Sequence, residues 1–317
     1  MNATKEHITQ LILSLHGREH WLIVIEFAAY LAVILTALLG NTLFILAVYK
    51  TRALQNPQNY YLVSLSGTDI LSAVACMPLT LVVLLKGTWP FGNFACQLQG
   101  SLIIICATVS LLTATMIAIN RYVKIVQSAS LYQKIFSRRN VLKSILISWI
   151  FAGFLITGVF FIRRKVFHFH PGKCLCFLKV NLKENVGIYS AITYSITVSL
   201  SFLLIVFSYY KVFKKIRAHF AQVANSSLRD ENSTPFTEEV KVTAMLFTTI
   251  IAFFICWTPS VIVDFQDAIR GYYTLPRQVY LFNVFSYFCS SAVNPMIYGL
   301  MKRQFREAYK KVLCCRN

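Results

Sequence analysis

Seven long apolar stretches dominate the sequence, and they set the main constraint on its fold. Each has the roughly 20 residues that a helix needs to cross about 30 Å of hydrocarbon. The alternating polarity of membrane-barrel strands is not found in them. Because a lipid-exposed backbone must satisfy its hydrogen bonds internally, we expect seven spanning helices. The stretches are Trp21–Tyr49, Tyr60–Leu85, Cys96–Ile119, Leu142–Ile162, Val186–Phe213, Val240–Phe265 and Val279–Leu300.

The composition agrees with a membrane protein and argues against a soluble enzyme. Of 317 residues, 56% are hydrophobic and 14% are charged, whereas soluble domains are about 45–50% apolar and about 25% charged. The net charge is +19, but most Lys and Arg residues fall on one side of the predicted membrane. This asymmetry indicates basic cytoplasmic loops rather than nucleic-acid binding. We therefore expect a multi-pass plasma-membrane protein in contact with lipid, with its N-terminus extracellular and its C-terminus cytoplasmic.

The predicted fold is all-α, a seven-transmembrane helix bundle with a short amphipathic eighth helix. We divide the chain into an extracellular N-terminus (1–20), the bundle (21–300), and the amphipathic helix with a short cytoplasmic tail (301–317). The polar segment Arg217–Glu239 is expected to be a simple cytoplasmic loop.

Two motifs near the ends of the chain predict covalent modification. Asn2 begins an Asn-Ala-Thr sequon, which predicts glycosylation on the outer side. Cys314 and Cys315 follow the amphipathic stretch Lys302–Leu313, and juxtamembrane cysteines after such a helix are typical of palmitoylation.

Polar groups within and beside the spans are the candidate functional residues. Asp69 lies about ten residues inside the second span, where a carboxylate is costly unless it is paired or hydrated. Arg121 ends the third span, and Glu239 opens the sixth on the same side, so the two could form a latch. Pro259 predicts a kink beside Trp257 in the sixth span. Candidate partners of Asp69 are Asn41, Ser110, Ser290, Ser291 and Asn294.

Three cysteines fall on the predicted extracellular side. Cys96 opens the third span, and Cys174 and Cys176 lie in the loop before the fifth. An oxidising exterior permits one disulfide from Cys96 to either Cys174 or Cys176. No zinc-ligand spacing of Cys and His is present, so no metal site of that kind is expected.

Short motifs occur in a fixed order along the seven spans, and together they resemble rhodopsin-like (class A) G-protein-coupled receptors over nearly the whole chain. The Asn-Arg-Tyr triplet is a variant that is also found in melatonin-type receptors. The motifs are Gly40-Asn41, Leu65-Ser66-Gly67-Thr68-Asp69, Trp89-Pro90-Phe91-Gly92 followed by Cys96, Asn120-Arg121-Tyr122, Trp149, Phe253 with Cys256-Trp257-Thr258-Pro259, Asn294-Pro295-Met296-Ile297-Tyr298, and Phe305.

This resemblance implies roles for individual residues and for partners. The partners would be a small extracellular ligand, a heterotrimeric G protein and, after activation, arrestin. Asp69, Ser110 and Asn294 would form an allosteric Na⁺ pocket, and Trp257 would form the bottom of the ligand pocket. Arg121 would meet the G protein. The implied set of coupling and switch residues is Asn120, Arg121, Tyr122, Tyr209, Glu239 and Tyr298.

The chain also departs from the family pattern. Asn120 replaces an aspartate and cannot form the local ion pair that restrains Arg121, so we expect Glu239 to be the remaining restraint and the off-state to be leaky. Pro295 distinguishes the chain from melatonin receptors, which have alanine there. Ser201 stands where the fifth span of the family has proline.

The implied pocket favours a small, fairly apolar ligand that is not a monoamine. Ile103 takes the place of the aspartate of amine receptors, and Phe288 that of the Schiff-base lysine of opsins. The loop before the fifth span is basic, which suits either attraction of an acidic ligand or a solvated surface near headgroups. The implied lining is Ile103, Ile104, Ala107, Thr193, Tyr194, Thr197, Trp257, Ser260, Val261, Asp264, Val284 and Phe288.

Two other classes of membrane protein fit the sequence less well. An ion-coupled transporter or channel using Asp69 is the alternative, but the halves of the chain show no repeat, and proton relays usually need several intramembrane acids. A membrane enzyme is not expected, because the sequence has no HExxH motif and its six histidines all lie outside the predicted spans.

Overall fold

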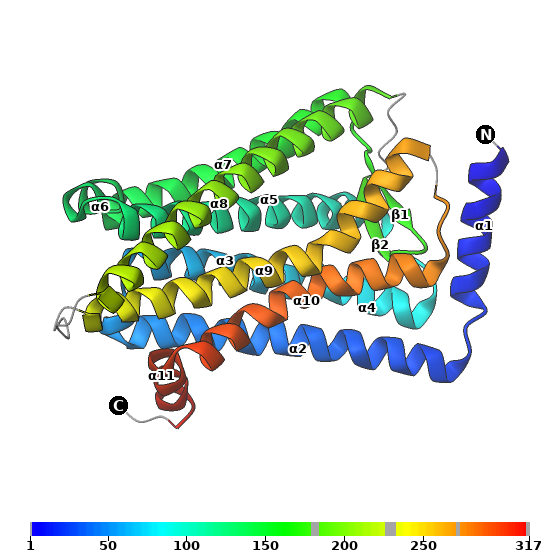
Figure 1. Cartoon of the computed structure of the whole chain (residues 1–317). Helices are drawn as coiled ribbons and strands as arrows, with labels where there is room; N and C mark the ends of the chain where they lie inside the picture. The colour runs from blue at the N-terminus through cyan, green and yellow to red at the C-terminus, as the bar shows by residue number, and fades with distance from the viewer. Residues whose placement is uncertain (1, 179–183, 226–232, 271–272, 315–317) are drawn as a thin grey trace.

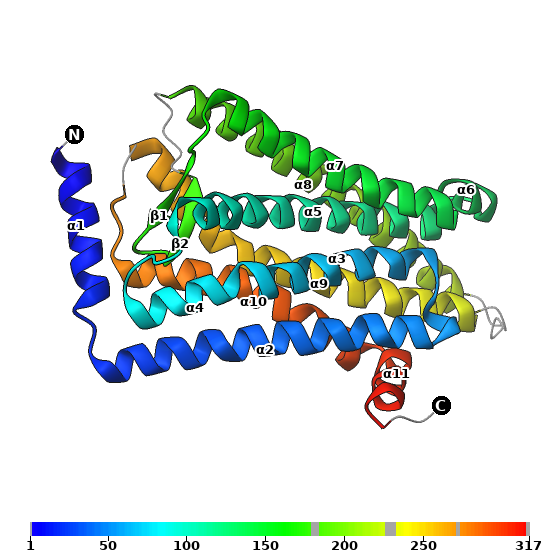
Figure 2. The ribbon, with the colours of Figure 1, turned by 180° about the vertical axis from the view of Figure 1, so that it is seen from behind.

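The structure, a computed structural model of the whole chain, describes residues 2–178, 184–225, 233–270 and 273–314. It confirms an all-α seven-helix bundle with a short eighth helix (Figures 1 and 2). The bundle consists of α2 (His20–Lys50), α3 with α4 (Pro57–Ala75 and Met77–Lys86), α5 (Gly92–Val126), α7 (Arg138–Ile162), α8 (Asn185–Asn225), α9 (Ser233–Arg270) and α10 (Arg277–Met301).

Six of the described helices are long and apolar enough to cross a membrane, counting α3 and α4 as one span. The helix α10 is the seventh member, and it packs against α9 and α2. The central helix is α5, which contacts α3, α7, α8 and α9. A side chain on α5 can therefore meet groups from most of the bundle, and three of the six predicted switch residues, Asn120, Arg121 and Tyr122, lie on it.

Local sequence explains several helix boundaries. The side chain of Asn56 accepts a hydrogen bond from the N–H of Asn59, and Pro57 occupies the first turn, so α3 has a capped start. Ser137 caps α7 in the same way. The second span breaks at Cys76, two residues before Pro78, because proline removes a helical hydrogen bond. The helices α9 and α10 continue through Pro259 and Pro295.

Two parts of the fold differ from the sequence prediction at the ends of the bundle. Residues 217–225 and 233–239, assigned to a loop, continue α8 and α9 as helix. Lys, Arg, Ala and Gln are good helix formers, so polarity alone does not end a helix. The segment before the first span, for which no structure was predicted, forms α1 (Asn2–His16), whose Leu11 and Leu15 are buried.

A β-hairpin, which the sequence analysis also missed, lies at one end of the bundle. Its strands β1 (Phe167–His170) and β2 (Leu175–Leu178) pair antiparallel, with Phe167 opposite Leu178. We call this the hairpin end; α1 lies across it (Figure 1). At the other end, the α11 end, are η1 (Arg52–Leu54), α6 (Ala129–Ile135) and α11 (Arg303–Leu313), which packs on α2 and α10.

Candidate functional site

The buried guanidinium of Arg121 is the centre of a polar network at the α11 end. Its side chain is held from two sides: Nη1 donates to Oε2 of Glu239 over 2.9 Å, and Nη2 donates to Oδ1 of Asn120 over 2.9 Å. Asn120 in turn donates to the hydroxyl of Tyr132 on α6 at 3.4 Å. Lys124 lies 3.8 Å from the same Glu239 carboxylate.

This geometry refines the expectation that Glu239 alone restrains Arg121. Asn120 supplies a neutral hydrogen bond in place of the ion pair that an aspartate would give. A neutral acceptor holds an arginine less strongly than a carboxylate does. The network therefore ties α5 to both α9 and α6, with its charged contact on the α9 side.

Two of the three tyrosines assigned to the switch, Tyr209 and Tyr298, make no hydrogen bond to this network among the described residues. Tyr209 packs its ring on Phe213 and Phe247, with centroids 6.1 and 4.9 Å away. Tyr298 packs 4.9 Å from the ring of Phe44 and 6.0 Å from that of Phe305. Both hydroxyls are buried and find no hydrogen-bond partner among the described residues. The third aromatic residue of the set, Tyr122, accepts a hydrogen bond from Gln127 and packs on Phe207.

A second polar cluster lies in the middle of the bundle, around Asp69. Nδ2 of Asn294 on α10 donates to Oδ2 of Asp69 over 2.9 Å. Ser110 instead hydrogen-bonds to Thr68, the residue before Asp69, at 3.0 Å. Asn41 donates to the carbonyl of Ser291, which links α2 to α10. The oxygen donors of Asp69 and Ser110 are of the kind that a small hard cation such as Na⁺ accepts.

The residues of the implied ligand pocket are distributed over α5, α8, α9 and α10. On α5 and α10, Ile103, Val284 and Phe288 are buried, and Ile104 and Ala107 are partly buried. On α8, Thr193 and Thr197 are partly buried, whereas Tyr194 is 47% exposed. On α9, Trp257, Ser260 and Asp264 are partly buried, and Val261 is 39% exposed.

Sequence reasoning missed two groups that meet the α9 part of this set. Ser260 donates a short hydrogen bond to Oδ1 of the buried Asn283, and the ring of Tyr287 lies 4.8 Å from that of Trp257, edge to face. Phe253 stacks on the same Trp257 at 5.0 Å. Both missed residues are on α10 and have no motif around them, so only their position in the fold brings them to the pocket.

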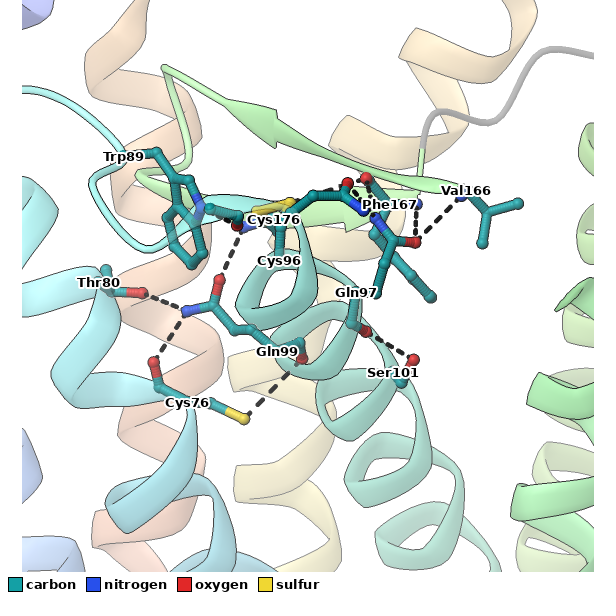
Figure 3. Close-up of a disulfide and its surroundings, with 12 residues drawn as sticks. Cys76, Thr80, Trp89, Cys96, Gln97, Gln99, Ser101, Val166, Phe167 and Cys176 are labelled. Atoms are coloured by element: carbon teal, nitrogen blue, oxygen red, sulfur yellow. Dashed lines mark hydrogen bonds between the residues drawn. A yellow bond between two sulfur atoms is a disulfide. The ribbon is translucent and has the colours of Figure 1, made fainter. Parts of the chain in front are cut away.

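A disulfide between Cys96 and Cys176 anchors the hairpin near the start of α5 (Figure 3). Of the two alternatives left open by the sequence, Cys176 is therefore the partner, and Cys174 is a free, buried thiol. Gln99 reinforces the anchor, since its Oε1 accepts the N–H of Cys176 at 2.8 Å and its Nε2 donates to the carbonyl of Cys76 at 2.9 Å. Gln97 makes three similar contacts with Val166 and Phe167.

The hairpin turns one of its basic residues into the bundle. Nζ of Lys173 pairs with Oδ1 of Asp264 on α9 and lies 4.1 Å from the ring centre of Phe177. The Lys173 side chain is buried and Asp264 is about one-third exposed. Another loop cation, Arg163, pairs with Glu184 at 3.0 Å on the surface. Lys179 and Lys183 lie outside the described residues.

The N-terminal helix α1 completes the hairpin end. Leu11 packs with Val263, Tyr273 and Tyr280, and Leu15 with the core beneath. The segment after α1 is fastened by a buried charge cluster. Arg18 and Arg277 both contact the carboxylate of Glu26, with closest N–O distances of 2.8 and 2.6 Å. Together α1 and the hairpin cover this end of the bundle, which we call the mouth.

Comparison with known proteins identifies this architecture. The family profile described as "7 transmembrane receptor (rhodopsin family)" matches residues 40–298, most of the chain. The chain belongs to this receptor family. It is a G-protein-coupled receptor of the rhodopsin class and not an enzyme, as predicted.

Several receptors of known name resemble this one at moderate identity. Melatonin receptor type 1C of Xenopus laevis is 28% identical over 88% of this chain and 65% of its own length, slightly under two thirds. The Gallus gallus receptor of the same type is 27% identical over 90% and 81%. The 5-hydroxytryptamine receptor 4 of Cavia porcellus is 27% identical over 90% of this chain and 78% of its own. These names differ in ligand, so the resemblance supports the receptor class and not one ligand.

Proposed function

We propose that this receptor binds a small, fairly apolar extracellular ligand and activates a heterotrimeric G protein at its α11 end. The observation that carries the proposal is the network of Arg121 with Glu239 and Asn120. It joins α5 to α9 and to the short helix α6 at the α11 end of the bundle. An agonist would shift the population toward a state in which this network is open and Arg121 is free to meet the G protein.

The composition of the pocket supports a ligand that is not a monoamine. Ile103 is buried where a cationic amine would need a carboxylate. The acid among the implied lining residues, Asp264, already pairs with Lys173. Serotonin, histamine and dopamine are therefore expected to leave second-messenger output unchanged. A response to any of them at matched surface expression would contradict this part of the proposal.

The disulfide and the basic loops support the proposed orientation. Disulfides persist in oxidising compartments, so the hairpin end would be extracellular and the α11 end cytoplasmic. In this topology residues 1–20, 21–300 and 301–317 are the three parts of the chain, Asn2 is available for glycosylation, and Cys314, exposed at the end of α11, is available for palmitoylation. Cys315 lies outside the described residues. The basic face of α11 would lie on membrane lipid, and arrestin would share the Arg121 surface.

The polar cluster around Asp69 is the candidate Na⁺ pocket. Asp69 and Ser110 would hold the ion, with Asn294 orienting the carboxylate, and the ion would contribute positive charge that stabilises one state of the bundle. The transporter alternative based on Asp69 has no separate support, because the chain belongs to the receptor family.

Basal cyclic AMP and calcium, measured in cells that express the receptor, test the proposal. The wild type and Arg121→Ala are compared at matched surface levels. We expect the wild type to signal without ligand, because Asn120 restrains Arg121 only weakly, and the variant to be silent. If Arg121→Ala signals as strongly as the wild type, the central role of this arginine is wrong.

A further inference from the structure

His170 is a buried imidazole at the hairpin end, where β1 ends below α1. Its ring packs against two tyrosines, with centroid distances of 3.9 Å to Tyr273 and 4.5 Å to Tyr280. Tyr280 is near the start of α10, and Tyr273 precedes that helix. The His170 ring therefore holds the hairpin against the top of α10.

The hydrogen bonds of His170 require a neutral ring. The backbone N–H of Lys173 donates to Nδ1 over 3.2 Å, so Nδ1 acts as an acceptor and carries no proton. The proton of the neutral ring is then on Nε2, which is buried and finds no partner among the described residues. A buried N–H donor without an acceptor is unfavourable, so the closed conformation leaves the desolvation cost of the His170 Nε2–H uncompensated.

Every element packed around the ring contributes titratable or charged groups. Nζ of Lys173 is held by Asp264, the hydroxyl of Tyr280 donates to Asp267 at 2.7 Å, and Nε2 of His7 donates to the carbonyl of Leu275 at 3.1 Å. None of them accepts a hydrogen bond from His170 among the described contacts. The groups are Lys173 on the hairpin, His7 on α1, Asp264 and Asp267 on α9, Tyr273 before α10, and Tyr280 on it.

These surroundings oppose protonation while the mouth is closed. Burial, and then the nearby Lys173 ammonium, hold the pKa of His170 well below its ordinary value. In an open mouth the ring would meet water, and its pKa would return to about 6.5. Protonation therefore does not affect the balance of the two states well above pH 6.5. As the pH falls below about 6.5, the ratio of open to closed receptor rises by up to about tenfold per pH unit.

Protonation would also break contacts that keep the hairpin closed. A proton on Nδ1 removes the acceptor for the Lys173 N–H and places a second cation beside the Lys173 side chain. That residue carries the ion pair to Asp264, which joins the hairpin to α9. A charge on His170 would therefore weaken the contact that holds the hairpin to α9.

We propose that this receptor senses extracellular protons, which bind His170, release the hairpin tip and open the mouth under α1. The function is separate from recognition of an organic ligand. The proposed proton-binding site is at the hairpin end, and the proton is bound in the open state.

Cys174 provides a built-in reporter of this opening. Its thiol is fully buried, forms no disulfide and donates a weak hydrogen bond to the carbonyl of Pro171 over 3.5 Å. Burial raises the pKa of Cys174 to about 12, so the thiol should be unreactive in the closed mouth. The full-length receptor on intact cells is treated with a membrane-impermeant thiol reagent between about pH 7.5 and about pH 5.5, a range centred on the ordinary histidine pKa. Cys174→Ser gives the background from other thiols.

The informative variant is His170→Asn, because its Oδ1 can still accept the Lys173 N–H but cannot be protonated in this range. Dividing the wild-type labelling rate by that of His170→Asn at the same pH removes the intrinsic pH dependence of the thiol. We expect this ratio to rise by up to about tenfold from about pH 7.5 to about pH 5.5. His7→Gln keeps a side-chain donor for Leu275 and loses the other nearby histidine, so it should behave as the wild type.

A ratio that stays flat would overturn the proposal, and so would a pH response that His7→Gln abolishes. If His170→Asn does not reach the surface, the wild-type rate divided by that of a small free thiol in the same buffer gives the test without a variant. Labelling needs no G protein, so its result is independent of whether the signalling proposal holds.

Discussion

Arg121 on α5 and Glu239 on α9 form an ion pair in which the guanidinium is buried and the carboxylate is about one-third exposed. The pair joins the central helix of the bundle to the helix that carries Pro259. Because the sequence separation is 118 residues, the contact depends on the packing of the whole bundle and not on local structure. Any movement of the Glu239 end of α9 away from α5 must break this ion pair.

Glu239→Gln is expected to raise basal signalling about fivefold, because it removes the charge from this contact. A pair with one partly exposed partner is worth about 1 kcal/mol after solvent screening. Glu238→Gln is the matched control, since Glu238 pairs with Lys241 on the surface of the same helix turn and should leave the baseline unchanged. Basal cyclic AMP at equal surface expression is the measurement. An unchanged output from a coupling-competent Glu239→Gln receptor would mean that the pair does not restrain the off-state.

Asn120→Asp is expected to lower basal signalling, because a carboxylate would replace the neutral acceptor of the Arg121 Nη2 hydrogen bond. The same carboxylate could accept from the hydroxyl of Tyr132, so the link to α6 would be retained. A charged acceptor is roughly twice as strong as a neutral one. The test is the basal output of this variant beside the wild type. A higher output would show that Asn120 restrains Arg121 better than an acid does.

Gln99→Leu is expected to destabilise the receptor by about 2 kcal/mol, because the N–H of Cys176 and the carbonyl of Cys76 would be left without their partner. Leucine nearly conserves the volume of the side chain, so packing is not the main loss. Gln55→Leu removes an exposed hydrogen bond to Tyr49 and should cost far less. Thermal unfolding of the purified receptor with the disulfide intact compares the two. Equal melting temperatures would contradict a role for Gln99 in anchoring the hairpin.

Gly40→Ala should be destabilising by about 1–3 kcal/mol, since overpacking is costly where neighbours cannot move. A Cβ at this position would lie 2.7 Å from Cγ of Pro295, a rigid ring on α10. Gly67→Ala is the control, because a Cβ there would meet nothing within 4 Å. Alanine also favours helix over glycine, so this control is expected to be neutral or slightly stabilising. Unfolding of the two variants in one detergent checks the difference.

The seven-helix bundle could be predicted from the sequence because each membrane-spanning helix is a long apolar stretch, which local composition reveals. Ordered motifs also identified Asp69 and Asn294 as a set, although 225 residues separate them. The hairpin end could not be predicted in the same way. Lys173 is one of several basic loop residues, and only the fold shows that it turns inward to Asp264.

The helix α1 was missed for a related physical reason. It is 15 residues long, and an isolated helix of that length is marginal in water. Its stability comes from Leu11 and Leu15, whose partners are on α9, α10 and the hairpin. The choice between Cys174 and Cys176 was open because the two lie two residues apart in one loop. In the fold, Cys176 lies in β2 opposite Phe169 and reaches Cys96, whereas Cys174 lies in the turn before β2.

The carboxylate of Glu26 implies an order of assembly during synthesis. Arg18 is eight residues before it, so this first contact can form as soon as the opening span has left the ribosome. Arg277 follows it by 251 residues and reaches it only when the seventh span arrives. Glu26 would then be paired with Arg18 alone until the seventh span is synthesised. Insertion of the seventh span, α10, would then bring Arg277 to Glu26 and join α10 to α2, the first helix of the bundle.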